Sequence, residues 1–190
     1  MNNAHLSIRM VILIVLCTAE TDMVMAEERS VRPPSSETYV SATINADGHL
    51  AILKTNGQSV LVRKEGEQTT FSEPLISSAK TAVAAQAMFG NCCTSYDIPL
   101  QLVVYAGGKV HRFNGVGLPI FQWGFADSGT RIAYGQEPVH SACATHYELR
   151  DIKSEQLIEA VDVPQPCGGI PDPKPLKIPD WVATLISKKR

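Results

Sequence analysis

Short apolar runs alternate with polar turns along most of the chain, over residues 38–163. The runs are rich in Val, Ile, Leu and Tyr, which favour strands over helices. They are ETYVSATIN, HLAILK, SVLVRK, PLQLVVY, KVHRF, RIAYG, HYELRD and EQLIEAV. The turns between them include Asn56-Gly57 and Gly107-Gly108, pairs that are typical of tight hairpins. The pattern predicts an all-β domain built of antiparallel meanders.

The alanine-rich segment AKTAVAAQAMF is ambiguous, because alanine favours helices. Its place in an internal repeat predicts a strand instead, since each copy has an apolar residue, a short turn and then an apolar strand. The three copies are ATINADGHLAIL (42–53), LISSAKTAVAA (75–85) and FADSGTRIAY (125–134). Gly48 and Gly129 occupy the same place in the turn, and Lys80 stands there in the middle copy.

The repeat divides the domain into three units. Residues 71–114 and 120–161 read as four-stranded meanders, and residues 38–64 read as a shorter three-stranded one. Repeats of this length are typical of propeller blades and related β-arrays. A closed propeller has about four to eight blades, and this chain has room for three at most. We expect a partial propeller-like array, a sandwich or open barrel, or a homodimer that covers the exposed end.

The third copy and the hairpin after it resemble one blade of the TolB-type WD-like propeller repeat. That repeat has an aromatic residue, a turn with Asp and Gly, a strand with an apolar-Ala-Tyr core, and a hairpin that ends on Asp. The matching residues are Phe125, Asp127, Gly129, Ile132, Ala133, Tyr134, Leu149 and Asp151. Asp47 and Gly48 carry the resemblance more weakly, and the middle copy departs from it with SSAK in the turn. The resemblance implies either a binding or scaffolding surface made of blade-like sheets or a propeller attached to a separate catalytic domain, and we expect the first because no separate catalytic domain fits this sequence.

Residues 1–26 have the parts of a secretory signal peptide: a short basic start, the apolar run MVILIVLCTA, and small residues before a cleavage site after Ala26. Cleavage after Ala19 is the alternative. The apolar run is shorter than the roughly 20 residues of a spanning helix, so we expect no membrane span after cleavage. A retained signal anchor and a lipidated Cys17 stay open, although Leu16 is larger than the residue that lipidation favours. The segment predicts a periplasmic or secreted protein.

Two further segments flank the β domain. Residues 27–37, EERSVRPPSSE, predict a flexible leader. Residues 164–190 begin with a Pro-rich stretch, which cannot form a helix or a central strand because each proline lacks a backbone donor. We expect this stretch to be an extended arm fastened through Cys167 and followed by a short helix in WVATLISKK.

Four cysteines remain after signal cleavage, namely Cys92, Cys93, Cys143 and Cys167. An even number in an oxidising compartment predicts disulfides. Adjacent cysteines rarely bond to each other, so we expect one of Cys92 and Cys93 to bond Cys143 and the other to bond Cys167. The first bridge would join equivalent loops of neighbouring meanders, and the second would hold the arm.

The segment HSACATH suggests a different chemistry, because His140, Cys143 and His146 recur at three-residue intervals. Imidazole and thiolate groups suit zinc or copper, and the loop with two adjacent thiols could complete four ligands. The interval does not match a standard zinc knuckle, and export favours oxidised cysteines. A small metal-binding protein or enzyme that uses these three residues is therefore the alternative hypothesis.

The remaining features narrow the function further. The net charge of −2 gives no basis for nucleic-acid binding, and no Gly-x-Ser-x-Gly motif is present. Glu148, Asp151, Glu155 and Glu159 alternate along two strands, and we interpret them as a solvated face. We expect no catalytic residue and no cofactor. The sequence favours a binding or scaffolding module that is stabilised by disulfides, with a protein partner in the cell envelope.

Overall fold

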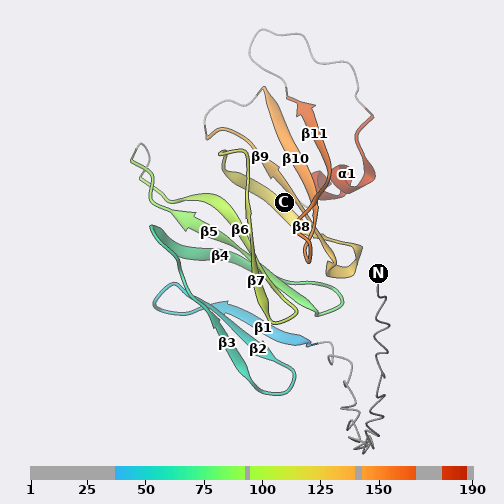
Figure 1. Ribbon diagram of the computed structural model, residues 1–190. Coiled ribbons are helices and arrows are strands. Elements are labelled where there is room, and N and C mark those ends of the chain that lie inside the picture. The colour runs from blue at the N-terminus through green and yellow to red at the C-terminus, as the bar shows by residue number, and fades with distance from the viewer. Residues whose placement is uncertain (1–36, 93–94, 140–142, 166–176, 188–190) are drawn as a thin grey trace, which may run out of the picture. The chain divides into compact units, whose positions relative to one another are not determined.

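A computed structural model describes residues 37–92, 95–139, 143–165 and 177–187, which all belong to one compact unit spanning residues 34–190. Three antiparallel sheets follow one another along the chain (Figure 1). Each is a meander in which successive strands are neighbours. The predicted all-β class is therefore confirmed, with one three-stranded and two four-stranded units. The predicted signal peptide, most of the leader and most of the Pro-rich arm lie outside the described residues.

The strands divide among the sheets as the repeat predicts. Sheet A consists of β1 (Tyr39–Ile44), β2 (Leu50–Lys54) and β3 (Ser59–Val62). Sheet B consists of β4 (Gln68–Ile76), β5 (Ala82–Phe89), β6 (Ile98–Ala106) and β7 (Lys109–Asn114). Sheet C consists of β8 (Ile120–Ala126), β9 (Arg131–Gln136), β10 (Ala144–Asp151) and β11 (Leu157–Pro164). A short 3-10 turn, η1 (Asp127–Gly129), joins β8 to β9, and the helix α1 (Asp180–Ser187) follows the Pro-rich arm.

The turn after the first strand of each sheet has a common backbone geometry. Gly48, Lys80 and Gly129 all have positive φ angles, of 78°, 60° and 103°. This region favours glycine, because a side chain there crowds the backbone. Lys80 adopts it without being glycine, which explains why the middle copy of the repeat is the hardest to recognise in the sequence.

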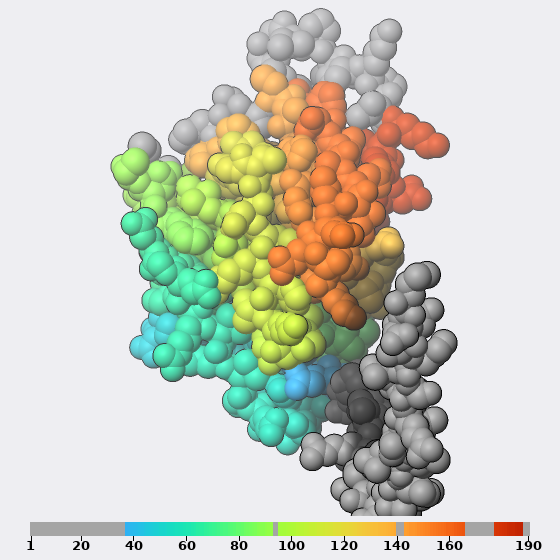
Figure 2. All heavy atoms as spheres, in the orientation of Figure 1, coloured from blue at the N-terminus to red at the C-terminus, as the bar shows by residue number. Residues whose placement is uncertain are grey.

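The sheets stack face to face, with sheet B between sheets A and C (Figure 2). One cluster of buried residues joins sheets A and B, and its members include Leu50, Ile52, Phe71, Val83 and Val103. A second cluster joins sheets B and C, and its members include Ala84, Leu102, Val104, Ile132 and Tyr134. The blades of a propeller are likewise small sheets, each packed against the sheet that follows it in the chain.

The position of β5 explains its alanines. Residues 82–87 are all buried, so this strand is covered on both faces. Ala85 and Ala87 pack toward sheet A, while Ala82 and Ala84 pack toward sheet C. Small side chains on both faces let the two neighbouring sheets approach the same strand closely. Tertiary packing thus overrides the helical preference of alanine.

The outer face of sheet C is covered by α1. Val182 and Leu185 of the helix are buried against Ala133, Tyr147 and Leu149 of the sheet. The apolar positions recur at three-residue spacing, which places them on one side of the helix. The predicted C-terminal helix is therefore confirmed, and it packs on the third sheet of the stack.

Candidate functional site

The loops at one end of sheets B and C come together, and we call this end the loop face. It contains the described residues of the loops 90–97, 115–119 and 137–143. Glu137 donates its backbone N–H to the Pro119 carbonyl at 3.2 Å, which joins two of these loops. Gln86 of β5 donates from Nε2 to the carbonyl of Ile120 at 2.6 Å, which links the same ends of the two sheets.

Large apolar side chains are exposed on the loop face. Tyr96 is 54% exposed and Val116 is 62% exposed, and Phe121 at the start of β8 is also exposed. Scattered exposed apolar residues are ordinary on a protein surface. Three of them at the same end of two adjoining sheets make this end a candidate interaction surface.

The charged side chains within the described residues of the three loops are carboxylates. Asp97 accepts from the Thr69 hydroxyl at 2.5 Å, and Glu137 accepts from the Thr145 hydroxyl at 3.0 Å. The described residues of the three loops include no lysine or arginine. The face therefore offers apolar side chains together with negative charge.

A buried carboxylate lies just beneath this face, on the side of sheet C that packs against sheet B. Glu148 of β10 is only 3% exposed. Its carboxylate accepts from the Tyr134 hydroxyl at 2.6 Å and from Arg150 Nε at 2.6 Å. Gln136 Nε2 lies 3.4 Å away and His146 Nε2 lies 3.3 Å away. The position follows from the register, because Glu148 pairs with Tyr134 and His146 pairs with Gln136 across the β9–β10 hairpin.

The ionised form of Glu148 is the stable one. Burial raises the pKa of a carboxyl group, but the hydrogen bonds from Tyr134 and Arg150 and the positive charge of Arg150 outweigh burial and lower the pKa of Glu148. Burial raises the pKa of the Tyr134 hydroxyl, and its bond to Glu148 raises it further. The charge of Arg150 neutralises that of Glu148. The network therefore resembles a structural ion pair more than an acid or base that titrates near neutral pH.

The same network positions one of the exposed loops. Gln136 is fully buried, and its Oε1 accepts the backbone N–H of Val116 at 2.6 Å. A Cβ atom at Gly115 would lie 1.6 Å from that oxygen, so only glycine allows this approach. The loop that displays Val116 is thereby fixed to the buried carboxylate through Gln136.

The buried position of Glu148 was not predicted from the sequence. The prediction that Glu148 belongs to a solvated face is wrong, because this side chain is buried while Glu155 and Glu159 are exposed. A partial signal was present, since Tyr134, Gln136, Glu148 and Arg150 are polar residues at alternating positions of two neighbouring apolar strands. Their pairing across the hairpin could be found only once the register was known.

The residues of the predicted metal and disulfide sites are only partly described. His140, Cys93 and Cys167 lie outside the described residues. Cys92 follows β5 and Cys143 precedes β10, and both are exposed at the loop face. The disulfide pairing therefore stays a prediction.

His146 is engaged with carboxylates on both ring nitrogens. Its Nδ1 lies 2.6 Å from Asp162 Oδ1, in addition to the contact between Nε2 and Glu148. Within the described part of the chain, no group of three or more His, Cys, Asp or Glu residues has an arrangement that could hold a metal ion. None of the helices in that part is long and apolar enough to cross a membrane.

No known protein family matches the chain, and no curated protein is similar to it in sequence. Among solved structures, it is similar to hydrazine synthase of Kuenenia stuttgartiensis, with a TM-score of 0.42, 14% identity, and coverage of 70% of this chain and 35% of that one. It is also similar to an acylaminoacyl peptidase of Pyrococcus horikoshii (TM-score 0.40, 12% identity, 68% and 25% coverage). A third similar structure is the dihydro-heme d1 dehydrogenase NirN in complex with DHE (TM-score 0.40, 12% identity, 71% and 29% coverage). The chain spans 25–35% of the length of these proteins, and their activities are not transferred to it.

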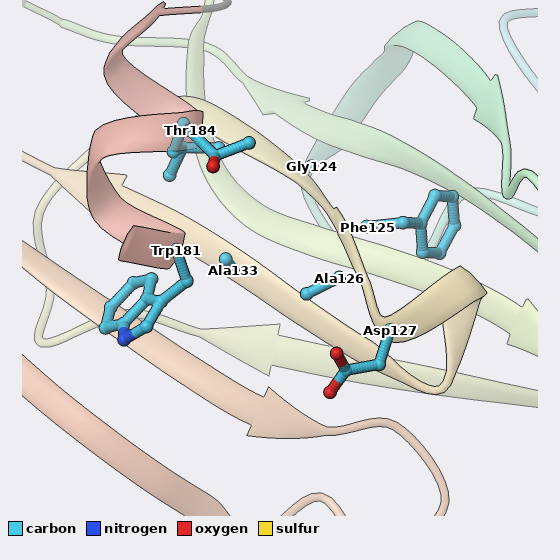
Figure 3. A pocket seen from close by; sticks show the side chains of 8 residues that line it. Gly124, Phe125, Ala126, Asp127, Ala133, Trp181 and Thr184 are labelled. Carbon is cyan, nitrogen blue, oxygen red and sulfur yellow. The ribbon is translucent and has the colours of Figure 1, made fainter. Parts of the chain in front are cut away.

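A hollow lies between α1 and sheet C. It encloses about 300 Å³ and is floored by the small residues Gly124, Ala126 and Ala133, with Trp181 as one wall and Asp127 near its rim (Figure 3). Its polar groups already have partners. The Trp181 indole donates to Glu159, and Asp127 is paired with Arg131, each at 2.8 Å. The hollow thus offers apolar room without converging polar groups that would select a ligand.

Proposed function

We propose that the chain is an exported, non-catalytic binding or scaffolding module whose loop face contacts a protein partner in the cell envelope. The observation that carries the proposal is the loop at Val116. Its exposed apolar side chain is presented on a backbone that is fixed to the buried Glu148 network through Gln136. A loop fixed in advance loses little conformational freedom on binding, which favours affinity.

The charge at this face supports a partner that presents apolar and basic side chains. Asp97 and Glu137 belong to the loops of this face, and they would attract positive groups and repel an anionic surface. Nucleic acid is disfavoured as a partner because its phosphates would be repelled by these carboxylates. The resemblance to TolB-type repeats supports the same general role, because it implies a surface for binding or scaffolding.

Disulfides are the second part of the proposal. We infer that one of Cys92 and Cys93 bonds Cys143 and the other bonds Cys167. Cys92 and Cys143 belong to loops at the same end of neighbouring sheets, which supports the first bridge. Each disulfide would stabilise the fold by about 2–4 kcal/mol. Peptide mapping without reduction tests the pairing, and a bond between Cys92 and Cys93 would overturn it.

A metal-binding protein or enzyme that uses His140, Cys143 and His146 is the alternative. His146 lies between two carboxylates, and a metal at its imidazole would have to replace at least one of these contacts. Metal analysis and thiol titration of protein exported to the periplasm distinguish the two functions. Four reduced thiols together with bound metal would favour the alternative.

A photo-crosslinking amino acid at Val116 tests partner binding directly. We expect a discrete adduct with one envelope protein in cells, and the same residue placed at Val110 should not give it. Val110 is a matched control, because it is exposed on β7, at the other end of this strand from the loop face. The adduct should be lost when Tyr96→Asp and Phe121→Asp are added. Equal labelling at the two positions would contradict the proposal.

A further inference from the structure

Each of the three sheets ends in two edge strands, and among the described residues no strand pairs with their outer sides. The backbone N–H and C=O groups on such a side are a template for a further strand. Proteins protect these edges with short strands, bulges or positive charge. The edges of this molecule can therefore be compared by how well each one is protected.

Five of the six edges among the described strands have such protection. The first strands β1, β4 and β8 are each interrupted by a bulge, at Val40, Glu73 and Phe121. The last strand of sheet A, β3, has only four residues. The last strand of sheet B, β7, carries Lys109 and Arg112. These edges are poor templates for pairing.

The last strand of sheet C, β11, is the exception. It has eight residues and no lysine or arginine, and its first two side chains, Leu157 and Ile158, are exposed. Its one bulge lies at Ile158, so the register with β10 is unbroken from Glu159 to Pro164. A regular stretch of this length is as long as a typical strand, and it can accept another strand along its open side.

The register of β10 and β11 shows which backbone groups face the open side. The N–H of Gln165 donates to the carbonyl of Cys143 at 2.9 Å, and bonded and non-bonded residues alternate along an antiparallel pair. Val161 therefore bonds to β10, whereas Ala160 and Asp162 direct their N–H and C=O groups away from it. These groups are the ones that an added strand would meet.

The charged side chains along this edge are acidic. Residues 155–165 contain no lysine or arginine, and their carboxylates are those of Glu155, Glu159 and Asp162. Two cations belong to the neighbouring segment. Arg150 of β10 is paired with Glu148, and Lys153 lies in the turn before β11. The strand itself presents negative charge to a partner.

Glu159 and Trp181 form the part of the edge that can select a side chain. The Trp181 indole donates to Glu159 at 2.8 Å, and this neutral donor leaves the charge of the carboxylate unbalanced. Asp162 differs, because its Oδ1 lies 2.6 Å from His146 Nδ1. A basic side chain next to Glu159 would meet a carboxylate and an aromatic ring, both of which attract cations.

We propose that β11 binds an extended segment of another protein, which joins sheet C as an added strand and alternates basic with apolar side chains. Main-chain hydrogen bonds to Ala160 and Asp162 would hold the segment, and the side chains would set the sequence preference. Pairing with β11 of a second copy is disfavoured, because it would gather the carboxylates of two acidic strands at one contact. The proposal does not depend on the loop face, since it uses the edge of sheet C.

Peptide binding to the purified full chain tests the proposal. The probe is the fluorescein-labelled peptide TVKVKVKT, and TVEVEVET is its acidic counterpart. Fluorescence anisotropy should show saturable binding of the lysine peptide, with affinity that falls as salt is added. The glutamate peptide should bind at least tenfold more weakly. Equal binding of the two peptides would overturn the proposal.

An N-methylated peptide separates strand addition from simple attraction between charges. Methyl groups on the backbone nitrogens of the valines and lysines remove the donors of both peptide edges but keep every charge. This peptide should bind at least tenfold more weakly than TVKVKVKT, because an added strand needs its main-chain donors. Unchanged binding would overturn the proposal.

Two variants of Ala160 test the same bonds from the side of the protein. Ala160→Pro removes an N–H on the open side, where proline is tolerated because no bond to β10 is lost. It should weaken binding of the lysine peptide at least tenfold. Ala160→Val is the matched control, because it keeps the N–H, and it should bind like wild type. Thermal unfolding checks that both are folded, and a proline variant that binds like wild type would contradict the proposal.

A photo-crosslinker at Ile158 of the purified full chain identifies what occupies the edge. An adduct with the lysine peptide supports the proposal. An internal adduct to residues 1–36 or 166–176 would overturn it, because the chain would then cover its own edge. An adduct of twice the chain mass would overturn it as well. The Val116 adduct reports only on the loop face, so the two proposals can fail separately.

Discussion

Sheets A and C are the two outer sheets of the same stack, yet their environments differ. Sheet C is covered on both faces, by sheet B through Ile132 and Tyr134 and by α1 through Tyr147 and Leu149. Among the described residues, sheet A is covered on one face only, by sheet B. The two sheets share a repeat in the sequence, so the difference does not come from the strands themselves. It comes from the C-terminal helix, which follows the last sheet and has no counterpart among the described residues before the first.

The two inner interfaces differ as well. Sheets A and B meet through an apolar cluster. In it, the rings of Tyr39 and Tyr105 pack edge to face, with their centroids 5.6 Å apart. Sheets B and C meet through apolar residues, and the loop that joins them is also bonded to the Glu148 network through Gln136. Apolar contacts tolerate small shifts, whereas a charged hydrogen-bond network needs its partners in fixed positions. The position of sheet C therefore depends on charged hydrogen bonds as well as on apolar packing, whereas the described contacts between sheets A and B form an apolar cluster.

Replacing the buried carboxylate of sheet C should have the largest effect. Glu148→Ala would remove the carboxylate that accepts from Tyr134 and balances the charge of Arg150, and we expect a loss of about 3 kcal/mol in the free energy of unfolding. The partial exposure of Arg150 keeps this value at the low end of the usual range. Glu67→Ala, at an exposed carboxylate between sheets A and B, should change stability by less than about 0.5 kcal/mol. Urea denaturation measures both, and equal losses would show that the network does not hold sheet C.

A matched pair of leucines tests the two ends of the stack. Leu185→Ala removes a buried side chain beneath α1 and should cost about 2–3 kcal/mol. Leu61→Ala removes a side chain of the same type from the exposed face of sheet A, and it should cost less than about 0.5 kcal/mol in dilute protein. Both are measured by urea denaturation at low micromolar concentration. A large loss at Leu61 would mean that its face is covered in the folded chain.

The sequence could predict the sheets because their signal is local. Alternating apolar residues and turn pairs such as Asn56-Gly57 mark the hairpins, and the repeat fixes which strands belong together. It even places β5 correctly against the helical preference of its alanines. A short C-terminal helix in WVATLISKK was predicted too, with lysines at the end where the helix dipole favours positive charge. All of these features depend on residues that are close in the chain.

The candidate site could not be predicted in the same way, because it depends on contacts between sheets. Glu148 looks like its exposed neighbour Glu159 until the packing of sheet B against sheet C is known. Likewise, nothing in the sequence near Gly115 indicates that Gln136 lies against it. The packing of α1 on sheet C depends on the same kind of long-range contact. Long-range packing decides these points, and one sequence contains little record of it.

Two glycines with positive φ angles allow the cost of backbone strain to be measured apart from the cost of steric crowding. Gly57, in the β2–β3 hairpin of sheet A, has a φ angle of 82° and open space around the position of a Cβ atom. Gly129, before β9 of sheet C, has a φ angle of 103°. A Cβ atom there would lie 2.4 Å from Cβ of Ser77, which directly follows β4 of sheet B. Gly57→Ala should cost about 1 kcal/mol from the backbone alone. Gly129→Ala should cost about 1–2 kcal/mol more because it also pushes sheets B and C apart, and thermal unfolding of the two variants measures the difference. Equal losses would show that the turn can move away from Ser77.

The smallest expected effect is a difference in pH dependence that belongs to sheet C. The pKa of Glu148 in the folded protein lies below its usual value of 4.5, so between these two values the unfolded chain binds more protons than the folded one. Stability from this group is therefore fully present above about pH 4.5 and is lost as the pH falls through the folded-state pKa. Asp151, whose pKa is lowered by hydrogen bonds from Ser154, contributes in the same direction in both proteins. Unfolding free energies measured from pH 7 to pH 3 should consequently fall less steeply for Glu148→Gln than for wild type. Parallel curves would mean that Glu148 is not held in its ionised form, and the rigid support beneath the loop face would then need another explanation.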